Sequence, residues 1–504
     1  MGQELLLGID VGTTGTKVIA FDTNGAVAAT AYKEYSCTYP APTWVEQDCA
    51  MLIRAVFSCC RTVVEKLGPR STCIAGISVS SQRSCTILAN STGRPIKMIS
   101  WLDSRAADQV KEIAAVMGSE RYYTITGMPL ATTWVLPKLL HIRERDPDTW
   151  KKTAKVLQLQ DVILYALGAE EFYSDEPDAS FWGTWDSCAF CHSREILDAF
   201  HLSPDLFPQV LPAGTPVGYI SPSASAKTGL QSGTPLCIGS GDQNSAALGA
   251  GVVSPGDASV SLGTGGLATV LLNHFYRDPA GQAMITHHAI HGLWTFEGLQ
   301  NAAAGVFRWF RDEIAALERQ QYGEAVYERL NEMIARTPPG ANGLLMLPFF
   351  AGSAAPRWDT SARGCILGLT FQHTRADMAR ACVEGITLEQ KDILQSLIDS
   401  GVQLHTVRIV GGATKSEVWN QIQADMYGIP CETLAVKDAA ALGAAICASV
   451  GCGLFSDLKE AAGNMVRVER RYEPEPAVRP IYDDLYRFYT RACDTLHSGG
   501  IFRR

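Results

Sequence analysis

The sequence predicts an α/β protein made of two related lobes. The chain has 504 residues, which exceeds what a single hydrophobic core usually holds. Residues 5–21 and residues 259–270 both show an apolar strand, a glycine- and threonine-rich turn and a second apolar strand. Strand-rich halves with crossover helices are typical of α/β folds. We therefore expect two lobes with a ligand cleft between them, where both hairpins would meet the ligand.

The elements of the first half follow from apolar periodicity and from the positions of turn residues. We expect three strands, a long helix, two further strands and two more helices. A region rich in Pro, Ser and Asp should then form loops and short elements. In chain order these ranges are residues 4–10, 16–22, 26–33, 47–67, 74–80, 85–89, 104–117, 132–145 and 170–235.

The second half repeats this plan. We expect three strands, a helical run that starts at Leu299, a long helix, and then a strand, a glycine turn and a helix within residues 407–417. The three strands and the long helix are placed at residues 258–263, 266–272, 284–298 and 375–400. The predicted domains are residues 1–252, residues 253–455, and a C-terminal extension of residues 456–504 that packs on the lobes.

Composition limits the classes of partner. The formal net charge is −9, which argues against a general nucleic-acid binder or a membrane-surface binder. No apolar run approaches the ~18 residues that a membrane-spanning helix needs. Fifteen cysteines are scattered through the chain, and the start shows no secretion-signal pattern. We therefore expect reduced thiols in a cytoplasmic protein that binds neither nucleic acid nor membrane.

The first hairpin carries the clearest chemical signal. Asp10 stands at the end of the first strand, and a Gly/Thr turn and Lys17 follow it. Backbone amides and a lysine at such a turn suit phosphate oxygens, while the carboxylate suits a Mg²⁺ ion, directly or through water. A tight turn without a ligand is the alternative interpretation, but the second hairpin, which repeats the pattern, favours the phosphate site.

Asp242 is the second informative residue. An apolar strand ends in a Gly-Ser-Gly turn, and Asp242 then opens a helical stretch. Two interpretations fit this position: an N-cap of the helix, or a general base that accepts the proton of a hydroxyl during phosphoryl transfer. Neither a Walker A loop nor a G-x-G-x-x-G strand–helix turn occurs in the sequence.

Several segments, which span nearly the whole chain and follow one another in the family's order, resemble motifs of the FGGY carbohydrate kinases. The resemblance implies two related actin-like, ribonuclease-H-like ATPase domains. It also implies an ATP-dependent phosphotransferase that acts on an alcohol group and uses Mg²⁺. The matching segments are residues 8–14, 101–105, 137–140, 241–243, 263–265, 364–369, 377–384, 411–416, 419–421, 424–425 and 428–430.

The resemblance also assigns roles to individual residues. Asp242 is the implied catalytic base, and Asp10 is the implied Mg²⁺ ligand. The implied ATP-binding residues are Gly12, Thr13, Thr14, Lys17, Gly263, Thr264, Gly265, Gly411, Gly412 and Ala413. The implied sugar-binding residues are Ser81, Gln82, Arg83, Trp101, Asp103, Asp242 and Gln243.

The chemistry of the sugar-binding residues leaves alternatives open. Trp101 can be a core residue or a pocket wall whose ring covers the C–H groups of a sugar. Asp103 can accept two sugar hydroxyls, because a carboxylate has several lone-pair sites. Arg83 can contact the substrate or pair with a neighbouring acid. His287 and its neighbours along a predicted strand are expected to be packed or solvated.

The substrate is the least determined feature. Residues 82–84 are Gln-Arg-Ser, where xylulokinases usually have Met-His-Gly and glycerol kinases have Gln-Arg followed by Glu. The Trp-x-Asp-x-Arg motif at residues 101–105 favours D-xylulose, converted to D-xylulose 5-phosphate. Alternatives are gluconate, glycerol or erythritol, or another ketose, and a non-catalytic actin-like ATPase switch is the competing class. The expected partner is a small sugar or polyol, and a homodimer is one option for the assembly.

Overall fold

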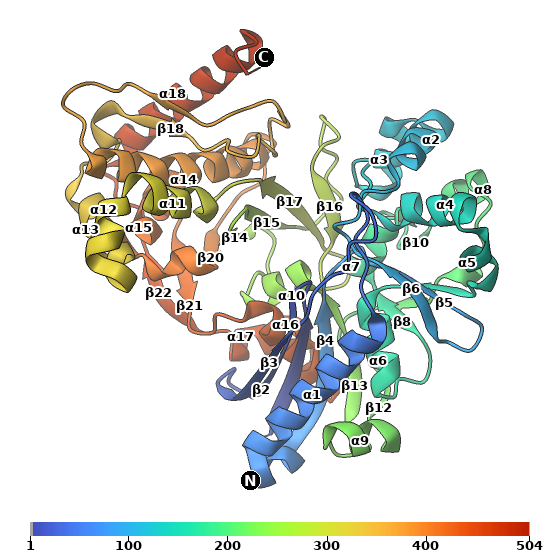
Figure 1. The fold of residues 1–504 in the computed structure, drawn as a ribbon. Helices are drawn as coiled ribbons and strands as arrows, with labels where there is room; N and C mark the ends of the chain where they lie inside the picture. The colour runs from blue at the N-terminus through green and yellow to red at the C-terminus, as the bar shows by residue number, and fades with distance from the viewer. Residues whose placement is uncertain (1–3, 503–504) are drawn as a thin grey trace. The chain divides into compact units, whose positions relative to one another are not determined.

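The computed structural model describes residues 4–502, which divide into two compact units (Figure 1). The first unit runs up to Val253 and adds Leu271–Thr295 and Asp438–Arg467. The second unit takes Ser254–Val270, Phe296–Lys437 and the described chain from Val468 onward. The units are therefore discontinuous in sequence, unlike our linear division, because the chain re-enters the first unit at Leu271 and again at Asp438.

A six-stranded sheet is the centre of the first unit, with the strand order β12-β13-β4-β1-β2-β3. Strands β13, β4 and β1 run parallel, whereas β2 and β3 are antiparallel additions that form the predicted hairpin. The bounds are β1 (Leu5–Val11), β2 (Gly15–Asp22), β3 (Val27–Glu34), β4 (Ile74–Ser81), β12 (Pro216–Tyr219) and β13 (Pro235–Gly241).

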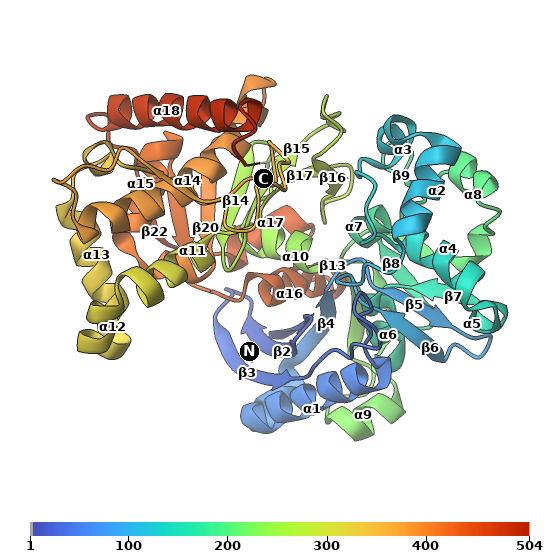
Figure 2. The same cartoon turned by 45° about the horizontal axis from the view of Figure 1, so that its top comes forward.

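Helices cover both faces of this sheet (Figure 2). Helix α1 (Cys49–Leu67) packs with α9 (Pro222–Thr228) on one face, and α16 (Ala439–Gly451) packs with α10 (Asp242–Gly249) on the other. The approach of α16 is so close that a Cβ atom on Gly8 would lie 1.9 Å from the carbonyl oxygen of Ala441. The small residues of α16 therefore allow tight packing against β1.

The rest of the first unit consists of short elements, as we expected for residues 170–235. A three-stranded sheet has the order β6-β5-β7. The remaining bounds are β5 (Thr86–Ala89), β6 (Pro95–Ile99), α2 (Ala107–Met117), α3 (Ser119–Thr126), α4 (Val135–Arg145), α5 (Pro147–Lys152), β7 (Lys155–Leu157), α6 (Leu159–Leu167), β8 (Tyr173–Asp175), α7 (Glu176–Ala179), β9 (Trp185–Asp186), β10 (Cys191–His192), α8 (Arg194–Ala199), β11 (Gln209–Leu211), β16 (Met284–His287) and α17 (Leu458–Met465).

The second unit is built on strands in the order β17-β15-β14-β20-β21-β22. Helix α14 packs against α11, α13 and α15. The bounds are β14 (Asp257–Leu262), β15 (Gly266–Leu272), β17 (Trp294–Gln300), α11 (Ala304–Trp309), α12 (Ala316–Tyr322), α13 (Val326–Arg336), β18 (Leu345–Leu347), β19 (Cys365–Leu367), α14 (Arg375–Asp399), β20 (Thr406–Val410), α15 (Glu417–Tyr427), β21 (Cys431–Leu434), β22 (Val468–Tyr472) and α18 (Arg479–Ser498).

Two expectations about the second half were wrong. The strand predicted at residues 284–298 is two strands, β16 and β17, because a turn closed by a hydrogen bond from Leu293 N to Ile290 O separates them. The helical run begins at Ala304 and not at Leu299, which lies inside β17. Within residues 4–502, none of the helices combines the length and the apolar character needed to cross a bilayer.

Candidate active site

The carboxyl ends of three parallel strands bring Asp10 and Asp242 to one edge of the first sheet. Asp10 is near the end of β1 and pairs in register with Ser80 of the neighbouring β4. Ser240 and Gly241 of β13 pair with Ser80 and Ser81 from the other side of β4, and Asp242 follows immediately. This edge is where ligands bind in open parallel sheets, so the fold itself places the two acids in a favourable position.

The charge of Asp242 affects the ionisation of Asp10. Burial raises the pKa of Asp10 to about 7, and the charge of Asp242 adds to the rise. A hydrogen bond from Ser80 Oγ at 3.3 Å and the charge of Lys17 only partly oppose it. Two carboxylates that destabilise each other's charged forms are suited to a cation, which would relieve the repulsion.

The first hairpin supplies a cation beside these acids. Lys17 lies opposite Asp10 in the β1–β2 register and forms an ion pair with Asp438, at the start of α16. The turn between Asp10 and Lys17 is closed by a hydrogen bond of 2.9 Å from Gly12 N to Gly15 O. Lys17, Asp10 and the turn thus lie together, as a site for a phosphate with its metal requires.

Asp242 is held by polar neighbours and not used as a helix cap. It is the first residue of α10, and its Oδ1 accepts a hydrogen bond of 2.7 Å from Gln243 N. Arg83 approaches it with an Nε–Oδ1 distance of 3.4 Å and donates to Asn244 Oδ1 at 3.0 Å. The side chain of Asp242 remains 29% exposed, so a substrate hydroxyl can reach its carboxylate.

A buried acid beneath Arg83 was missed by the sequence analysis. Asp178 is fully buried next to Gly241, where an added Cβ would lie 2.9 Å from Asp178 Oδ1 and 2.4 Å from Arg83 Cγ. Burial and the nearby Asp175 and Asp161 hold the pKa of Asp178 well above its usual range, and Arg83 opposes the rise. Arg83 therefore lies between two carboxyl groups, and a glycine at 241 is required for the contact.

Two of the predicted sugar-binding residues are held in hydrogen bonds within the protein. Ser81 is buried and accepts a hydrogen bond of 3.1 Å from Gln160 N. Gln82 is 1% exposed, and its amide bonds to Thr13 and to Gln47. The side chains of Ser81 and Gln82 therefore lie in the interior beneath the site. Gln243, which follows Asp242 in sequence, is half-buried.

Asp103 departs most from its predicted role. Its carboxylate has no exposed surface and pairs with the side chain of Arg105 at 2.7–2.9 Å. It also accepts hydrogen bonds from the backbone amides of Val45 and Arg105, at 2.6 and 3.0 Å. The prediction that Asp103 grips sugar hydroxyls stays a prediction, and both of its oxygens already accept hydrogen bonds within the protein.

Trp101 and Lys138 complete this side of the site. Trp101 is 39% exposed, which fits a pocket wall better than a core residue. Lys138 is fully buried and donates to the carbonyl oxygens of Ser84, Ser100 and Thr133 at 3.2, 2.9 and 2.6 Å. Burial lowers the pKa of Lys138 to about 7. This lysine therefore joins the segment after β4 to the segment that carries Trp101.

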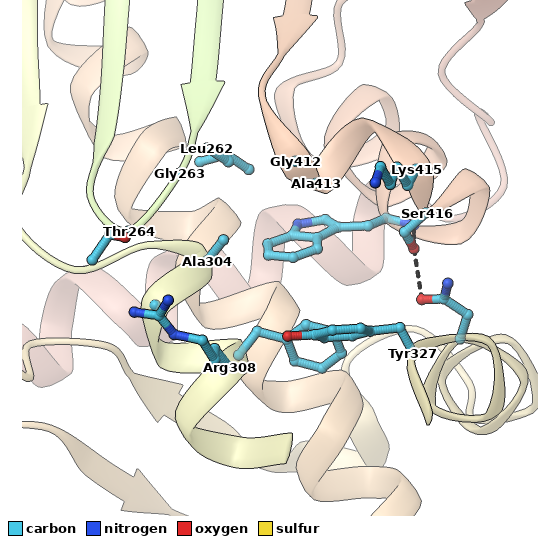
Figure 3. A pocket seen from close by; sticks show the side chains of 14 residues that line it. Leu262, Gly263, Thr264, Ala304, Arg308, Tyr327, Gly412, Ala413, Lys415 and Ser416 are labelled. Carbon is cyan, nitrogen blue, oxygen red and sulfur yellow. Dashed lines mark hydrogen bonds between the residues drawn. The ribbon is translucent and has the colours of Figure 1, made fainter. Parts of the chain in front are cut away.

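The second hairpin borders a cavity of about 350 Å³ inside the second unit (Figure 3). Its volume lies within the range of small-ligand pockets. Four of the predicted ATP-binding residues, Gly263, Thr264, Gly412 and Ala413, line it, whereas Gly265 and Gly411 are not among the lining residues. The other lining residues are Leu262, Ala304, Gly305, Phe307, Arg308, Tyr327, Asn331, Lys415, Ser416 and Trp419.

Aromatic side chains and cations share this cavity. Phe307 packs against Tyr327 and Trp419 with ring centroids 5.8 and 5.5 Å apart. Arg308 and Lys415 contribute positive charge, and no carboxylate is among the lining residues. Such a cavity suits a flat aromatic base joined to an anion. The sequence analysis missed Tyr327 because only tertiary packing brings α13 next to α11 and α15.

The predicted histidines belong to the packed interior. His287 and His288 are fully buried, and burial lowers the pKa of each to about 3. Trp185 Nε1 donates to His287 Nε2 at 3.0 Å, and the more exposed His291 pairs with Glu176 at 2.7 Å. Across residues 4–502, no group of three or more His, Cys, Asp or Glu side chains has the arrangement of a metal site.

Comparison with known proteins agrees with this fold. The N-terminal domain of the FGGY family of carbohydrate kinases matches residues 5–249, and the C-terminal domain matches residues 258–452. The chain is 28% identical to a xylulose kinase of Staphylococcus epidermidis over 97% of this chain and 96% of that protein. It is 31% identical to an autoinducer-2 kinase of Salmonella paratyphi B over 95% and 92%. A solved xylulose kinase structure from Rhodospirillum rubrum superposes with a TM-score of 0.90 at 29% identity, over 99% and 100%.

The fold and the acidic edge thus define a phosphotransferase with an alcohol group as acceptor. The chain belongs to the FGGY family of carbohydrate kinases. The predicted actin-like, two-domain fold class and the predicted family are confirmed. The roles of the individual site residues and the identity of the sugar stay predictions.

Proposed function

We propose that this protein transfers the terminal phosphate of ATP to a hydroxyl group of a small sugar, with D-xylulose as the first choice. The observation that carries the proposal is the presence of two acids, Asp10 and Asp242, at one edge of the first sheet. One acid has its pKa raised to about 7 partly by the other, and both lie at the carboxyl edge of one sheet. Phosphoryl transfer needs such a pair: a base for the acceptor hydroxyl and a ligand for the metal.

In this proposal Asp242 is the catalytic base. Its partly exposed carboxylate can accept the hydroxyl proton while the oxygen bonds to phosphorus. Arg83, 3.4 Å away, keeps the carboxylate oriented. Trp101 offers an exposed aromatic face to the carbon skeleton of the sugar.

The donor set around Asp10 fits Mg²⁺. This ion takes oxygen ligands, keeps several waters, and is usually held by one or two carboxylates together with phosphate oxygens. Asp10 would supply a carboxylate, with Asp242 close enough to share the charge. When bound, the ion would neutralise charge on the phosphates. Lys17, together with the turn at Gly12, is placed to contact the phosphates from the protein side.

The nucleotide base is assigned to the cavity of the second unit. Tyr327 and its aromatic neighbours would stack on adenine, while Arg308 and Lys415 would attract the phosphates. Thr264 is tied to the start of α11, because its carbonyl accepts hydrogen bonds from Ala303 N at 2.9 Å and Gly305 N at 3.3 Å. The second hairpin is thus held firmly at the edge of this cavity.

An autoinducer-2 kinase activity is the second candidate. It is favoured by the 31% identity to proteins of that name, which exceeds the identity to the xylulose kinase of S. epidermidis. Residues 82–84 also differ from the usual xylulokinase motif. Gluconate, glycerol, erythritol and ketoses other than D-xylulose remain alternative acceptors.

A substrate panel tests the proposal. Purified protein is incubated with Mg·ATP and each acceptor in turn, and ADP formation is measured against a reaction without acceptor. D-xylulose should give the highest kcat/KM. A higher value for autoinducer-2 or gluconate would replace D-xylulose and keep the kinase assignment. The absence of acceptor-dependent ADP from every member would contradict the proposed reaction.

A further inference from the structure

A closed ring of hydrogen bonds holds the tip of the first hairpin. Thr13 Oγ1 donates to Gln82 Oε1 at 3.0 Å, and Gln82 Nε2 donates to Gln47 Oε1 at 2.8 Å. Gln47 Nε2 then donates to the backbone carbonyl of Thr13 at 2.9 Å, which closes the ring. From outside the ring, the indole Nε1 of Trp101 donates to Thr13 Oγ1 at 2.9 Å.

The ring joins three segments of the first unit, those of Thr13, Gln47 and Gln82, and Trp101 connects a fourth segment to it. Gln47 precedes α1, and its backbone N–H donates to Met98 O at 3.2 Å; Gln82 follows β4, and its N–H donates to Val11 O at 2.9 Å. The two glutamines are 6% and 1% exposed, so water does not readily replace these bonds. Each amide acts as donor and acceptor at once, and all bonds run in the same direction, so they polarise one another.

We propose that Gln47 is a positioning residue that couples the phosphate-binding turn to the sugar-binding wall. The inference rests on the proposed function, in which Thr13 faces the phosphates and Trp101 faces the sugar. The indole already donates to Thr13 Oγ1 in the ligand-free protein, and a sugar packed against Trp101 would hold the indole, and through it Thr13, more firmly. Gln47 does not contact the substrate in this proposal. Its hydrogen bond to the Thr13 carbonyl keeps the turn where the indole of Trp101 can donate to Thr13 Oγ1.

The consequence is a limit on wasteful hydrolysis. If a sugar on Trp101 holds the phosphate-binding turn more firmly than the ligand-free contact does, then transfer of phosphate to water stays slow without an acceptor. Loss of the Gln47 amide leaves the carbonyl of Thr13 and the amide of Gln82 without a buried partner. Thr13 should then be less restrained, because only the bonds of its Oγ1 to Gln82 and Trp101 still hold it, and sugar-dependent turnover should fall relative to sugar-free ATP hydrolysis.

Four variants separate this role from a general effect on folding. Gln47→Ala removes both hydrogen bonds, and Gln47→Glu keeps the shape and the acceptor but loses the donor. Trp101→Phe keeps an aromatic ring but loses the N–H. The matched control is Gln109→Ala, which removes a 2%-exposed amide that donates to Glu144 at 2.7 Å and has no contact with the hairpin.

The first measurement needs no substrate. Amide hydrogen exchange of residues 11–17 in the ligand-free protein should accelerate by about 10-fold in Gln47→Ala and in Gln47→Glu, a factor equivalent to ~1.4 kcal/mol. Gln109→Ala should leave this segment unchanged. Equal exchange rates in the wild type and in both Gln47 variants would overturn the inference, even if no sugar in the panel proves to be a substrate.

The second measurement uses Mg·ATP with D-xylulose. In both Gln47 variants kcat should fall about 10-fold with a smaller change in KM, and the ratio of sugar-free hydrolysis to transfer should rise by a similar factor. Adding Trp101→Phe to Gln47→Ala should change this ratio little further, because both act through Thr13. Fully additive effects, or an equal change of the ratio in Gln109→Ala, would overturn the coupling role.

Discussion

The two hairpins share a topology but lie in chemically different surroundings. The first has carboxylates and a lysine around its tip, and the pKa of Asp10 is raised to about 7 there. The second borders a cavity with three aromatic rings, two cations and no carboxylate among the lining residues. A repeated strand–turn–strand element therefore serves as a scaffold, and the residues packed around each copy decide its chemistry.

In the proposed function, this difference divides the reaction between the two hairpins. The charged hairpin is suited to the metal, the transferred phosphate and the base, whereas the aromatic cavity is suited to the part of the nucleotide that does not react. Substitutions at the first site should therefore act on turnover, and substitutions at the second should act on nucleotide affinity.

The largest effect is expected at Asp242. Asp242→Asn preserves shape but cannot accept the hydroxyl proton, so kcat should fall by at least ~10²-fold while ATP still binds. Steady-state kinetics and nucleotide titration measure the two quantities. Asp48→Asn, which alters the exposed cap of α1, is the matched control and should be near normal. Near-normal turnover in Asp242→Asn would remove this residue from the base role.

Asp10 should affect both the metal requirement and the stability of the ligand-free protein. Asp10→Asn should raise the Mg²⁺ concentration needed for half-maximal rate by roughly 10-fold or more, because it removes an anionic ligand. The KM for the sugar should change much less. An unchanged Mg²⁺ dependence of the rate would contradict the assignment.

The pH dependence of stability follows from the same carboxyl group. Because its folded pKa of about 7 exceeds the ordinary 3.8, the stability that it contributes at low pH is lost as the pH rises through 7. Without metal and nucleotide, Asp10→Asn should therefore raise Tm by at least about 2 °C at pH 8, and by less at pH 5. Equal changes at both pH values would mean that burial of the charge is not the cause.

The aromatic cavity should respond in a different way. Tyr327→Ala removes a stacking surface, so the KM for ATP should rise about 10-fold while kcat and the KM for the sugar change little. Tyr322→Ala, which truncates a more exposed ring on the neighbouring α12, is the control. A selective fall in kcat for Tyr327→Ala would break the division between the two hairpins.

The smallest catalytic effect is expected at Asp103. Asp103→Asn weakens a fully buried ion pair with Arg105, so thermal stability should fall by several degrees, at about 2–4 °C for each kcal/mol lost. The KM for the sugar should stay within about 3-fold of the wild type, since the carboxylate has no exposed surface. A large rise in KM with unchanged Tm would restore the direct binding role.

Local patterns explain what the sequence could predict. Alternating apolar residues and Gly/Thr turns encode both hairpins, and the Gly-Ser-Gly turn before Asp242 marks the end of a buried strand. The position of a carboxylate relative to its strand was therefore readable from neighbouring residues. The partners of a side chain were not, since Asp103 is occupied partly by the amide of Val45, which is far away in sequence.

The residues missed by the sequence analysis depend on tertiary proximity. Gln47, Asp178 and Tyr327 each lie in a segment whose local pattern shows only a loop end, a short helix or an amphipathic helix. Their roles arise because folding places them beside Thr13, Arg83 and the Phe307–Trp419 pair, respectively. Such contacts join segments that are distant in sequence, so residue type and spacing give no signal of them.

In the proposed reaction, Asp242 acts as the base when phosphate passes from ATP to a sugar hydroxyl. Phosphorus NMR of a mixture of Mg·ATP, D-xylulose and the protein observes the transfer directly. A sugar-phosphate resonance should grow in a one-to-one ratio with ADP, and Asp242→Asn should suppress both. ADP with inorganic phosphate and no sugar phosphate, or an equal yield of sugar phosphate from Asp242→Asn, would rule out this role of Asp242.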